Sequence, residues 1–274
     1  QAQKVLFTGK QASGVQFLRK GAPSKVSARR EVILSSGAIG TPQLLQLSGV
    51  GPGGLLQKFG IDVVHDAPDV GGNLQDHLQI RCAYKIQGAK TLNVMASTLW
   101  GKAKIGLEYA LRRTGPMSMA PSQLGAFAYS DARIATPDLE YHVQPVTLEA
   151  FGQAPHDFPA ITASVCHLRP ESRGHVHITS PDHMDHPEIQ PNYLSTSGDR
   201  AVAVNAIRKT RQIMGQPALA QYLPEEFKPG ANYQSEEELI EGASRVASTI
   251  FHPVGQARMG VGARAGVDPQ LRVN

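Results

Sequence analysis

The sequence predicts an α+β fold, and two observations carry that prediction. Short stretches of alternating apolar residues, separated by Pro, Gly and Asp clusters, run from Asp138 to Leu194 and are typical of an antiparallel sheet. Two clear helical patterns then follow, from Arg200 to Met214 and from Glu236 to Val246. Strand-rich and helix-rich regions that occupy different parts of a chain favour α+β architecture.

Length and composition indicate a globular protein with a solvated, mixed-charge surface. The 274 residues are 41% hydrophobic, which is enough for a sizeable core. The 27 basic and 23 acidic residues give a net charge of +4, and no basic run is long enough to form a nucleic-acid patch. No apolar run approaches the roughly 20 residues that a membrane span needs.

Cysteine usage favours a reducing compartment. Cys82 and Cys166 are the two cysteines of the chain, and they form no CxxC motif. We therefore expect a cytoplasmic location, with peripheral membrane association left open.

The first strands are expected to form a small β-meander. Lys4 to Thr8 and Gly14 to Leu18 are two strands around a glycine turn, and Glu31 to Leu34 adds a third after a polar loop. The chain begins inside this strand pattern without a methionine, and it stops at VDPQLRVN, where a strand is expected to continue. We therefore expect an incomplete part of a longer protein.

A glycine-rich turn and a helix follow in SSGAIGTPQLLQLSGVGP. Thr41 as N-cap and Pro42 at the first helical position predict the helix start, and Gly49 is expected to end the helix. A second short helix is expected over 54–59, an extended segment over 60–66, and a longer helix over 97–113 with Ser97 as its N-cap.

The strand, turn and helix start at 35–47 is the first candidate site. Small residues let a cofactor approach the backbone, and the N–H groups of a helix start favour anionic groups. The stretch lacks GxGxxG spacing, so by itself it also fits a plain helix-capping turn.

Four histidines gather in GHVHITSPDHMDHPE, together with two aspartates, and imidazoles and carboxylates are ordinary zinc or iron ligands. His175 and His177 are two apart on a predicted strand and so face the same side, whereas His183 and His186 lie in a Pro- and Asp-rich turn with Asp182 and Asp185. Nothing in the spacing fixes a closed geometry. We therefore expect a solvated hairpin and no metal site.

Two further motifs contain histidine. In GGNLQDHL, Asn73, Asp76 and His77 are expected to cap the next element or tie a loop by hydrogen bonds. In FHPVGQARMG, His252 precedes Pro253, which biases it toward extended backbone at the end of an element. An imidazole there suits proton transfer near neutral pH.

Taken together, GAIGTPQLLQLSGVG, GGNLQDH, SRGHVHITS with PEIQPNYL, and HPVGQARMG followed by VDPQLRV resemble the glucose-methanol-choline (GMC) flavoprotein oxidoreductases in order and spacing. The resemblance covers nearly the whole chain and is closest to the choline and aliphatic alcohol dehydrogenase branch. It implies part of a two-domain flavoprotein. Residues 1–80 and 248–274 would belong to a partial Rossmann-like FAD domain, and 81–247 to a substrate domain with an antiparallel sheet and flanking helices.

The resemblance also implies site residues. His252 would be the general base that takes the hydroxyl proton of an alcohol while hydride passes to flavin N5 of FAD. FAD would contact residues near the glycine-rich turn and near the C-terminal end, namely Ser36, Gly37, Ala38, Thr41, Pro42, Asp268 and Pro269.

The sequence departs from the family at three points. Gln256 and Ala257 stand where the family usually has Thr and Cys. The dinucleotide fingerprint is not found and is expected upstream, and the partner of the base is expected beyond residue 274.

The sequence leaves several alternatives open. In the leading reading the chain is an incomplete part of the enzyme, inactive without a missing N-terminal flavin-binding portion. In an alternative reading it works as it stands, as a non-catalytic binding module or as one subunit of a split flavoprotein that a separate flavin-binding polypeptide completes. A lyase of the same fold that carries FAD is a third reading. The alcohol, the electron acceptor (oxygen, quinone or dye) and the oligomeric state are not assigned.

Overall fold

The computed structural model of the chain describes residues 1–120, 122–150, 152–262 and 264–273. The chain forms two compact units, each assembled from separate stretches. Unit 1 comprises residues 1–76, 171–193 and 251–274, and unit 2 comprises residues 77–170 and 194–250. The assignment of 1–80 and 248–274 to a flavin domain and of 81–247 to a substrate domain stays a prediction.

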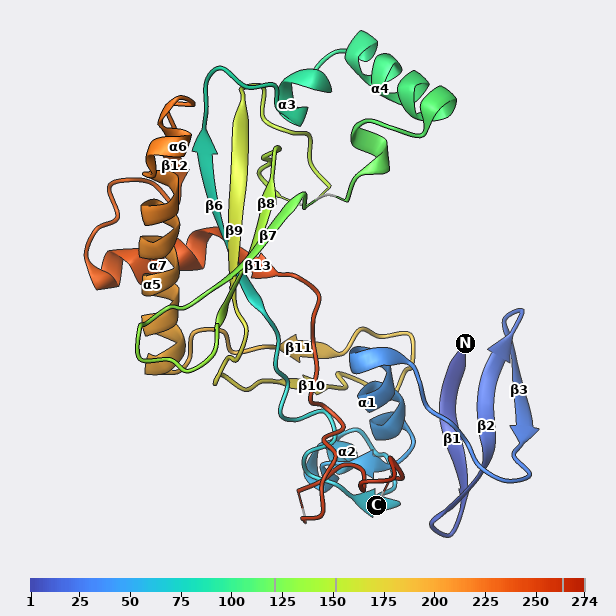
Figure 1. Cartoon of the computed structure of the whole chain (residues 1–274). Coiled ribbons are helices and arrows are strands. Elements are labelled where there is room, and N and C mark those ends of the chain that lie inside the picture. The colour runs from blue at the N-terminus through green and yellow to red at the C-terminus, as the bar shows by residue number, and fades with distance from the viewer. Residues whose placement is uncertain (121, 151, 263, 274) are drawn as a thin grey trace. The chain divides into compact units, whose positions relative to one another are not determined.

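Unit 1 begins with a three-stranded antiparallel sheet of β1 (Ala2–Thr8), β2 (Gln11–Arg19) and β3 (Ala22–Ser27) (Figure 1). Lys20 and Gly21 between β2 and β3 both have positive φ, 52° and 80°, as a tight two-residue hairpin turn requires.

The expected third strand at Glu31 to Leu34 is wrong, because β3 takes that place beside β2. Leu34 instead packs against the buried cluster of Leu45, Val50, Ala67 and Val70. An apolar run that contacts a core from a loop carries the same sequence pattern as a short strand.

The first helix, α1 (Gly37–Leu47), begins five residues earlier than its Thr-Pro pair predicts. Its N-cap is Ser36, Gly37 turns the chain at a φ of 76°, and Pro42 lies inside the helix. The prediction of Thr41 as N-cap is therefore wrong, and Thr41 Oγ1 instead accepts a hydrogen bond from the Ser36 N–H at 3.1 Å.

The remaining elements of unit 1 are short. The expected end of α1 is confirmed, since Gly49 has a φ of 89° just beyond it. The short helix α2 spans Gly53–Lys58, and β4 (Val50–Gly51) pairs in parallel with β5 (His65–Asp66). A two-stranded antiparallel sheet joins β10 (His175–His177) to β11 (Glu188–Gln190).

A fully buried glutamine of α1 holds unit 1 together. Gln46 Nε2 donates to the carbonyls of Val70 and Val176 at 3.1 and 2.9 Å, and Gln46 Oε1 accepts from the Ile178 N–H at 2.9 Å. These bonds satisfy backbone groups that no helix or sheet partner reaches. One side chain thus joins α1 to the loop before residue 71 and to β10.

Unit 2 is built on a six-stranded antiparallel sheet in the order β12-β6-β9-β8-β7, with β13 also paired to β6 (Figure 1). Its strands are β6 (Leu78–Lys85), β7 (Leu124–Ala128), β8 (Leu139–Gln144), β9 (Ala160–His167), β12 (Glu225–Lys228) and β13 (Ala247–Thr249).

Only some of the strands predicted for this sheet belong to it. The predicted strands DLEYHVQPV and AITASVCHL are confirmed as β8 and β9. GHVHITS and PEIQPNYL do not join them; they contain β10 and β11, which pair with each other in unit 1. The neighbours of β8 and β9 are instead β7 and β6, which lie outside the region that the pattern singled out.

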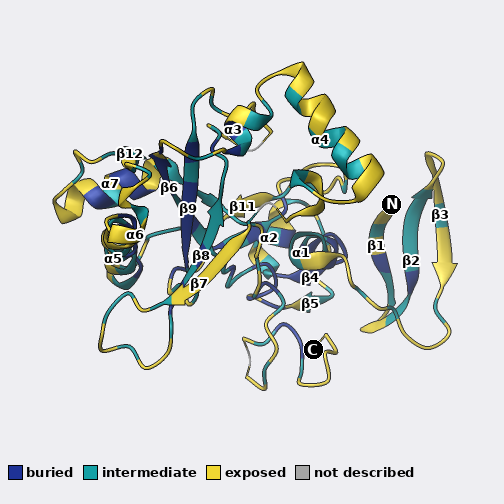
Figure 2. Cartoon of the chain, turned by 45° about the horizontal axis from the view of Figure 1, so that its top comes forward, coloured by how far each residue is buried: buried dark blue, intermediate teal, exposed yellow. Residues whose placement is uncertain are grey.

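Two long helices, α5 (Ser197–Met214) and α7 (Glu236–Val246), pack on this sheet and confirm the two clearest helical patterns. Their apolar faces pack in one buried cluster with β6, β8 and β9, which includes Ile80, Tyr84, Leu139, Val165, Ile207 and Leu239. Figure 2 colours most of β9 as buried. Burial also raises the pKa of the free Cys82 thiol to about 12, so this cysteine serves as a small apolar core residue.

The other helices of unit 2 lie nearer the surface. The helix predicted over 97–113 is α4 (Leu99–Arg112), whose N-cap is Thr98 rather than Ser97, because Thr98 Oγ1 accepts the Gly101 N–H at 3.0 Å. Figure 2 shows α4 largely exposed. The short elements are α3 (Leu92–Met95), a 3₁₀ turn (Pro116–Ser118) and α6 (Pro217–Ala220). Within the described ranges, none of the helices combines the length and apolarity needed to cross a bilayer.

Replacing Gln46 by Leu is expected to destabilise the chain by about 3 kcal/mol, because three buried backbone groups lose their partner. Gln43→Leu is the matched control, since the exposed Gln43 bond to the Asp185 carbonyl should cost less than about 1 kcal/mol. Urea titration of the whole chain measures both free energies of unfolding. Equal losses in the two variants would contradict the role given to Gln46.

Candidate functional site

The segment that carries His252 lies along residues 71–76 of the same unit. Val254 and Gln75 exchange backbone hydrogen bonds of 2.8 and 2.9 Å in an isolated antiparallel bridge. The Gly71 N–H donates to the Gln256 carbonyl at 2.8 Å. Two stretches nearly 180 residues apart in sequence thus form one short paired ribbon.

A buried carboxylate fixes the backbone of His252. Asp76 is 7% exposed; its Oδ1 accepts the His252 N–H at 3.0 Å, and its Oδ2 accepts the hydroxyl of Tyr193. Hydrogen bonds to an ionised acceptor are roughly twice as strong as neutral ones. Asp76 therefore holds the main chain of His252 in place.

The turn after His252 is also held closely. Asn73 Nδ2 donates to the Gly255 carbonyl at 3.2 Å. Gly255 has a φ of 101°, and a Cβ there would lie 2.4 Å from the Asn73 carbonyl oxygen, so only glycine fits. The His252 side chain itself is exposed.

The predicted structural role of GGNLQDHL is confirmed for Asn73 and Asp76, which tie the His252 segment by hydrogen bonds. His77 belongs to unit 2, where its Nε2 lies 3.2 Å from the Leu168 carbonyl.

The predicted cofactor residues of the glycine-rich turn lie at the start of α1. Ser36 and Gly37 are exposed, Ala38 and Thr41 are half-buried, and Pro42 is buried. The first turn contains no acidic residue, and a Cβ at Gly37 would meet nothing within 4 Å. An open helix start of this kind can accept an anionic or carbonyl group from a ligand.

Gln256, which stands in place of the family's threonine, is 2% exposed. Its Nε2 is buried and finds no hydrogen-bond partner among the described residues. A buried donor without an acceptor costs free energy, so an acceptor supplied by a ligand would relieve it.

Asp268 and Pro269 lie in the C-terminal loop of unit 1. The Asp268 carboxylate accepts the N–H groups of Gln270 and Arg272 at 2.9 and 2.8 Å and pairs with the Arg272 guanidinium at 2.7 Å. These hydrogen bonds hold the pKa of Asp268 below its usual range. Asp268 thus closes its own turn with its carboxylate, and its contact with a cofactor stays a prediction.

A second buried carboxylate, which the sequence patterns did not predict as a site residue, holds the RMG turn after His252. Asp69 is 7% exposed and pairs with Arg258 and Arg264, both at 3.1 Å. No local pattern connects residues 190 positions apart, so sequence alone gave no signal for this cluster.

The four histidines of GHVHITSPDHMDHPE are not brought together. His175 and His177 stack on β10 beside Glu188, whereas His183 pairs with Asp182 in its own turn. Burial, followed by the neighbouring His175, lowers the pKa of His177. The solvated hairpin expected here is therefore a two-stranded sheet with an ordered histidine pair.

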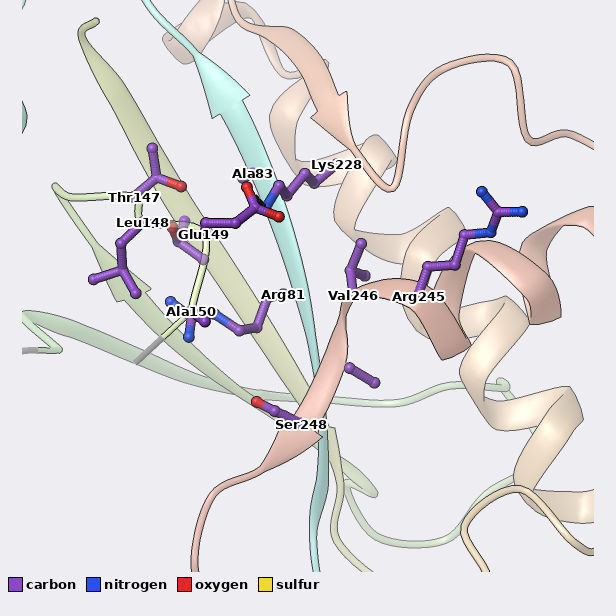
Figure 3. A pocket seen from close by; sticks show the side chains of 12 residues that line it. Arg81, Ala83, Thr147, Leu148, Glu149, Ala150, Lys228, Arg245, Val246 and Ser248 are labelled. Carbon is purple, nitrogen blue, oxygen red and sulfur yellow. Dashed lines mark hydrogen bonds and ion pairs between the residues drawn. The ribbon is translucent and has the colours of Figure 1, made fainter. Parts of the chain in front are cut away.

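Unit 2 contains a pocket of about 190 Å³ over β6, β9 and β13 (Figure 3). Three cationic side chains line it, Arg81, Lys228 and Arg245. Its one described acid, Glu149, is paired with Lys228 at 2.7 Å, and Arg245 is paired with Glu241 at 2.5 Å. Burial lowers the pKa of Arg81. None of the described lining residues is aromatic. The pocket therefore disfavours a cationic ligand.

Replacing Asp76 by Asn should loosen the His252 backbone, because one charged acceptor is lost from two hydrogen bonds. We expect exchange of the His252 amide proton to become roughly 10- to 100-fold faster, as measured by hydrogen exchange on the whole chain. Gln75→Ala is the control, since Gln75 joins the bridge through backbone atoms alone. Unchanged exchange at His252 in Asp76→Asn would refute the anchoring role.

Comparison with known proteins places these features in a family. Two sequence-family models, both described as GMC oxidoreductase, match residues 1–79 and 170–274. Relatives named oxygen-dependent choline dehydrogenase are 42% identical over 272 residues in Pectobacterium carotovorum and 41% identical over 273 residues in Burkholderia cenocepacia. These alignments cover 99% and 100% of the chain but 48% of each relative, so the chain spans about half the length of the curated relatives it matches.

Solved structures share the fold. Formate oxidase aligns with a TM-score of 0.90 at 24% identity, over 99% of this chain and 53% of that one. Pyridoxine 4-oxidase from Mesorbium loti aligns with a TM-score of 0.82 at 27% identity, over 99% of this chain and 49% of that one. The predicted α+β fold is confirmed by these neighbours and by the sheets and helices described above. The chain belongs to the GMC oxidoreductase family.

Proposed function

We propose that the protein containing this chain oxidises an alcohol to an aldehyde or ketone with FAD, and that His252 is the general base. Family membership and relatives named choline dehydrogenase support the reaction class. The observation that carries the role of His252 is its fixed backbone, since Asp76 holds the His252 N–H while the imidazole is exposed. We also propose a cytoplasmic location, which the cysteine usage favours.

The residues present fit part of an FAD site. The open start of α1, with Ser36, Gly37 and Ala38, offers backbone N–H groups to an anionic or carbonyl group. The buried Gln256 Nε2 offers a donor that has no acceptor among the described residues. When bound, FAD supplies the electron sink for the reaction.

In this reaction, the chain's own residues position the base and accept the proton of the alcohol. Proton loss from the alcohol oxygen to the His252 imidazole raises electron density on the carbinol carbon, which favours departure of its hydrogen with the bonding pair. A placed base of this kind contributes roughly 10²- to 10⁴-fold in rate. Asp76 accepts a hydrogen bond from the His252 N–H and Asn73 donates one to the Gly255 carbonyl, and together they fix the segment that carries this imidazole.

In the whole flavoprotein, His252→Ala should lower kcat by roughly 10²- to 10⁴-fold while flavin absorbance stays, because the base is lost and the helix start of α1 is untouched. His186→Ala, at an exposed histidine of the same unit, is the control and should keep full turnover. Anaerobic bleaching of the flavin by alcohol reports oxidation directly. A flavin that stays oxidised with substrate would favour the lyase reading, and undiminished turnover in His252→Ala would exclude His252 as the base.

The lining of the pocket in unit 2 indicates which charge a ligand bound there would carry. Relatives named choline dehydrogenase suggest choline, a quaternary ammonium alcohol. Such a cation is usually bound by aromatic faces or a free carboxylate. Arg81, Arg245 and the Lys228–Glu149 pair offer neither. We therefore propose that a ligand of this pocket is uncharged or anionic rather than a quaternary ammonium.

The test compares choline with 3,3-dimethylbutan-1-ol, which has the same shape and no charge. If the pocket binds substrate, kcat/KM should be about tenfold higher for the uncharged alcohol than for choline. Arg81→Gln should bring the two kcat/KM values closer together. Steady-state kinetics of the whole flavoprotein measure both ratios. A preference for choline of tenfold or more would contradict this substrate class while leaving the His252 proposal intact.

A further inference from the structure

The hairpin of β10 and β11 brings three metal-binding side chains to one face. His175 and His177 are two residues apart on β10 and so point to the same side. Glu188 on β11 is the direct cross-strand partner of His177. One ligand atom from each of these three side chains lies within 4.8 Å of the others. Two separate stretches of chain thus supply one cluster.

The spacing fits a single metal ion. His175 Nε2 and Glu188 Oε2 are 3.4 Å apart. Zinc binds imidazole nitrogen and carboxylate oxygen at about 2.0–2.2 Å, and two ligands of a tetrahedral ion at such distances are separated by roughly 3.4 Å. Two imidazoles and one carboxylate are also a donor set that zinc commonly takes, with a fourth position left for water.

The two imidazoles are preorganised. Their ring centroids are 4.2 Å apart and the ring planes differ by 23°. Stacking restricts the rotation of both rings, so less side-chain freedom is lost when they bind an ion. The hairpin supplies this pairing through ordinary strand geometry, without movement of the backbone.

The opposite face of β10 anchors the site. Val176, between the two histidines, is fully buried; its N–H donates to the Gly71 carbonyl at 2.6 Å, and its own carbonyl accepts from Gln46 Nε2 at 2.9 Å. The donor face remains open to solvent, since the side chains of His175 and Glu188 are 29% and 61% exposed. An ion can therefore reach ligands whose backbone is already held.

The neighbouring histidines do not belong to this cluster. His183 Nδ1 lies 3.3 Å from Asp182 within its own turn, and His186 is exposed in the loop before β11. Within the described ranges, His175, His177 and Glu188 are the one group of three such side chains with metal-ligand spacing.

We propose that His175, His177 and Glu188 bind one Zn²⁺ ion that joins β10 to β11, with water completing the coordination. The ion stabilises the hairpin because it replaces the His175–Glu188 contact with metal–ligand bonds from both β10 and β11. Because β10 also bonds Gly71 and Gln46, the same ion supports the strand beside the ribbon that carries His252. The proposal is independent of the reaction assigned above.

The test is zinc titration of the whole chain, produced without a polyhistidine tag, stripped with chelator and dialysed. Isothermal titration with ZnCl₂ should give saturable binding of one ion per chain. His175→Gln and Glu188→Gln should each weaken binding at least tenfold, because each removes one of three ligands. His186→Gln is the matched control and should bind zinc like the parent.

Thermal unfolding provides a second readout that separates misfolding from lost ligation. Zinc should raise the unfolding midpoint of the parent and of His186→Gln, and should leave that of Glu188→Gln unchanged. Glu188 is exposed, so without zinc this variant should unfold at the parent's midpoint. Absence of saturable binding in the parent, or parent-like binding in Glu188→Gln, would overturn the proposal.

Discussion

The buried carboxylate of Asp76 is the constraint on which the candidate site depends. It accepts hydrogen bonds from the His252 N–H and the Tyr193 hydroxyl, and these residues lie 176 and 117 positions away in sequence. A buried charge is costly unless its partners are all in place. Moving the segment after residue 250 away from residues 71–76 would remove one hydrogen-bond donor from that buried charge. This dependence fixes where the main chain of His252 lies, and the residue itself is exposed.

The two units are stabilised in different ways. Unit 2 buries the apolar faces of α5 and α7 against its sheet, so its stability comes mainly from hydrophobic packing. Unit 1 has small apolar clusters and relies in addition on the buried polar side chains Gln46, Asp69 and Asp76. Each of these satisfies several groups on distant loops, and such bonds define loop positions more sharply than apolar contacts do. That suits a unit whose functional residues lie on loops.

The parts of the fold that were predictable are those with local causes. The helix over Glu236 to Val246 follows from its own apolar spacing, and its start is fixed by a reciprocal Ser235–Glu238 cap. The helix α1 was placed five residues late, because Thr-Pro is a common start signal and nothing in the glycine-rich turn marks Ser36 as the N-cap. Strand pairing was the least predictable feature. β10 pairs with β11 and not with β9, because β9 already has β6 and β8 as its two neighbours.

By itself the sequence determined the family resemblance, the two principal helices, the same-face placement of His175 and His177, and His252 as the candidate base. Each of these depends on residues close together in the chain, where backbone geometry fixes the spacing. Only the tertiary structure decided that Asp76 holds His252, that Arg258 and Arg264 meet Asp69, and that Glu188 stands beside the histidine pair. Those contacts arise when strands and loops from distant stretches pair, and that pairing is set by burial and hydrogen bonding over a whole unit.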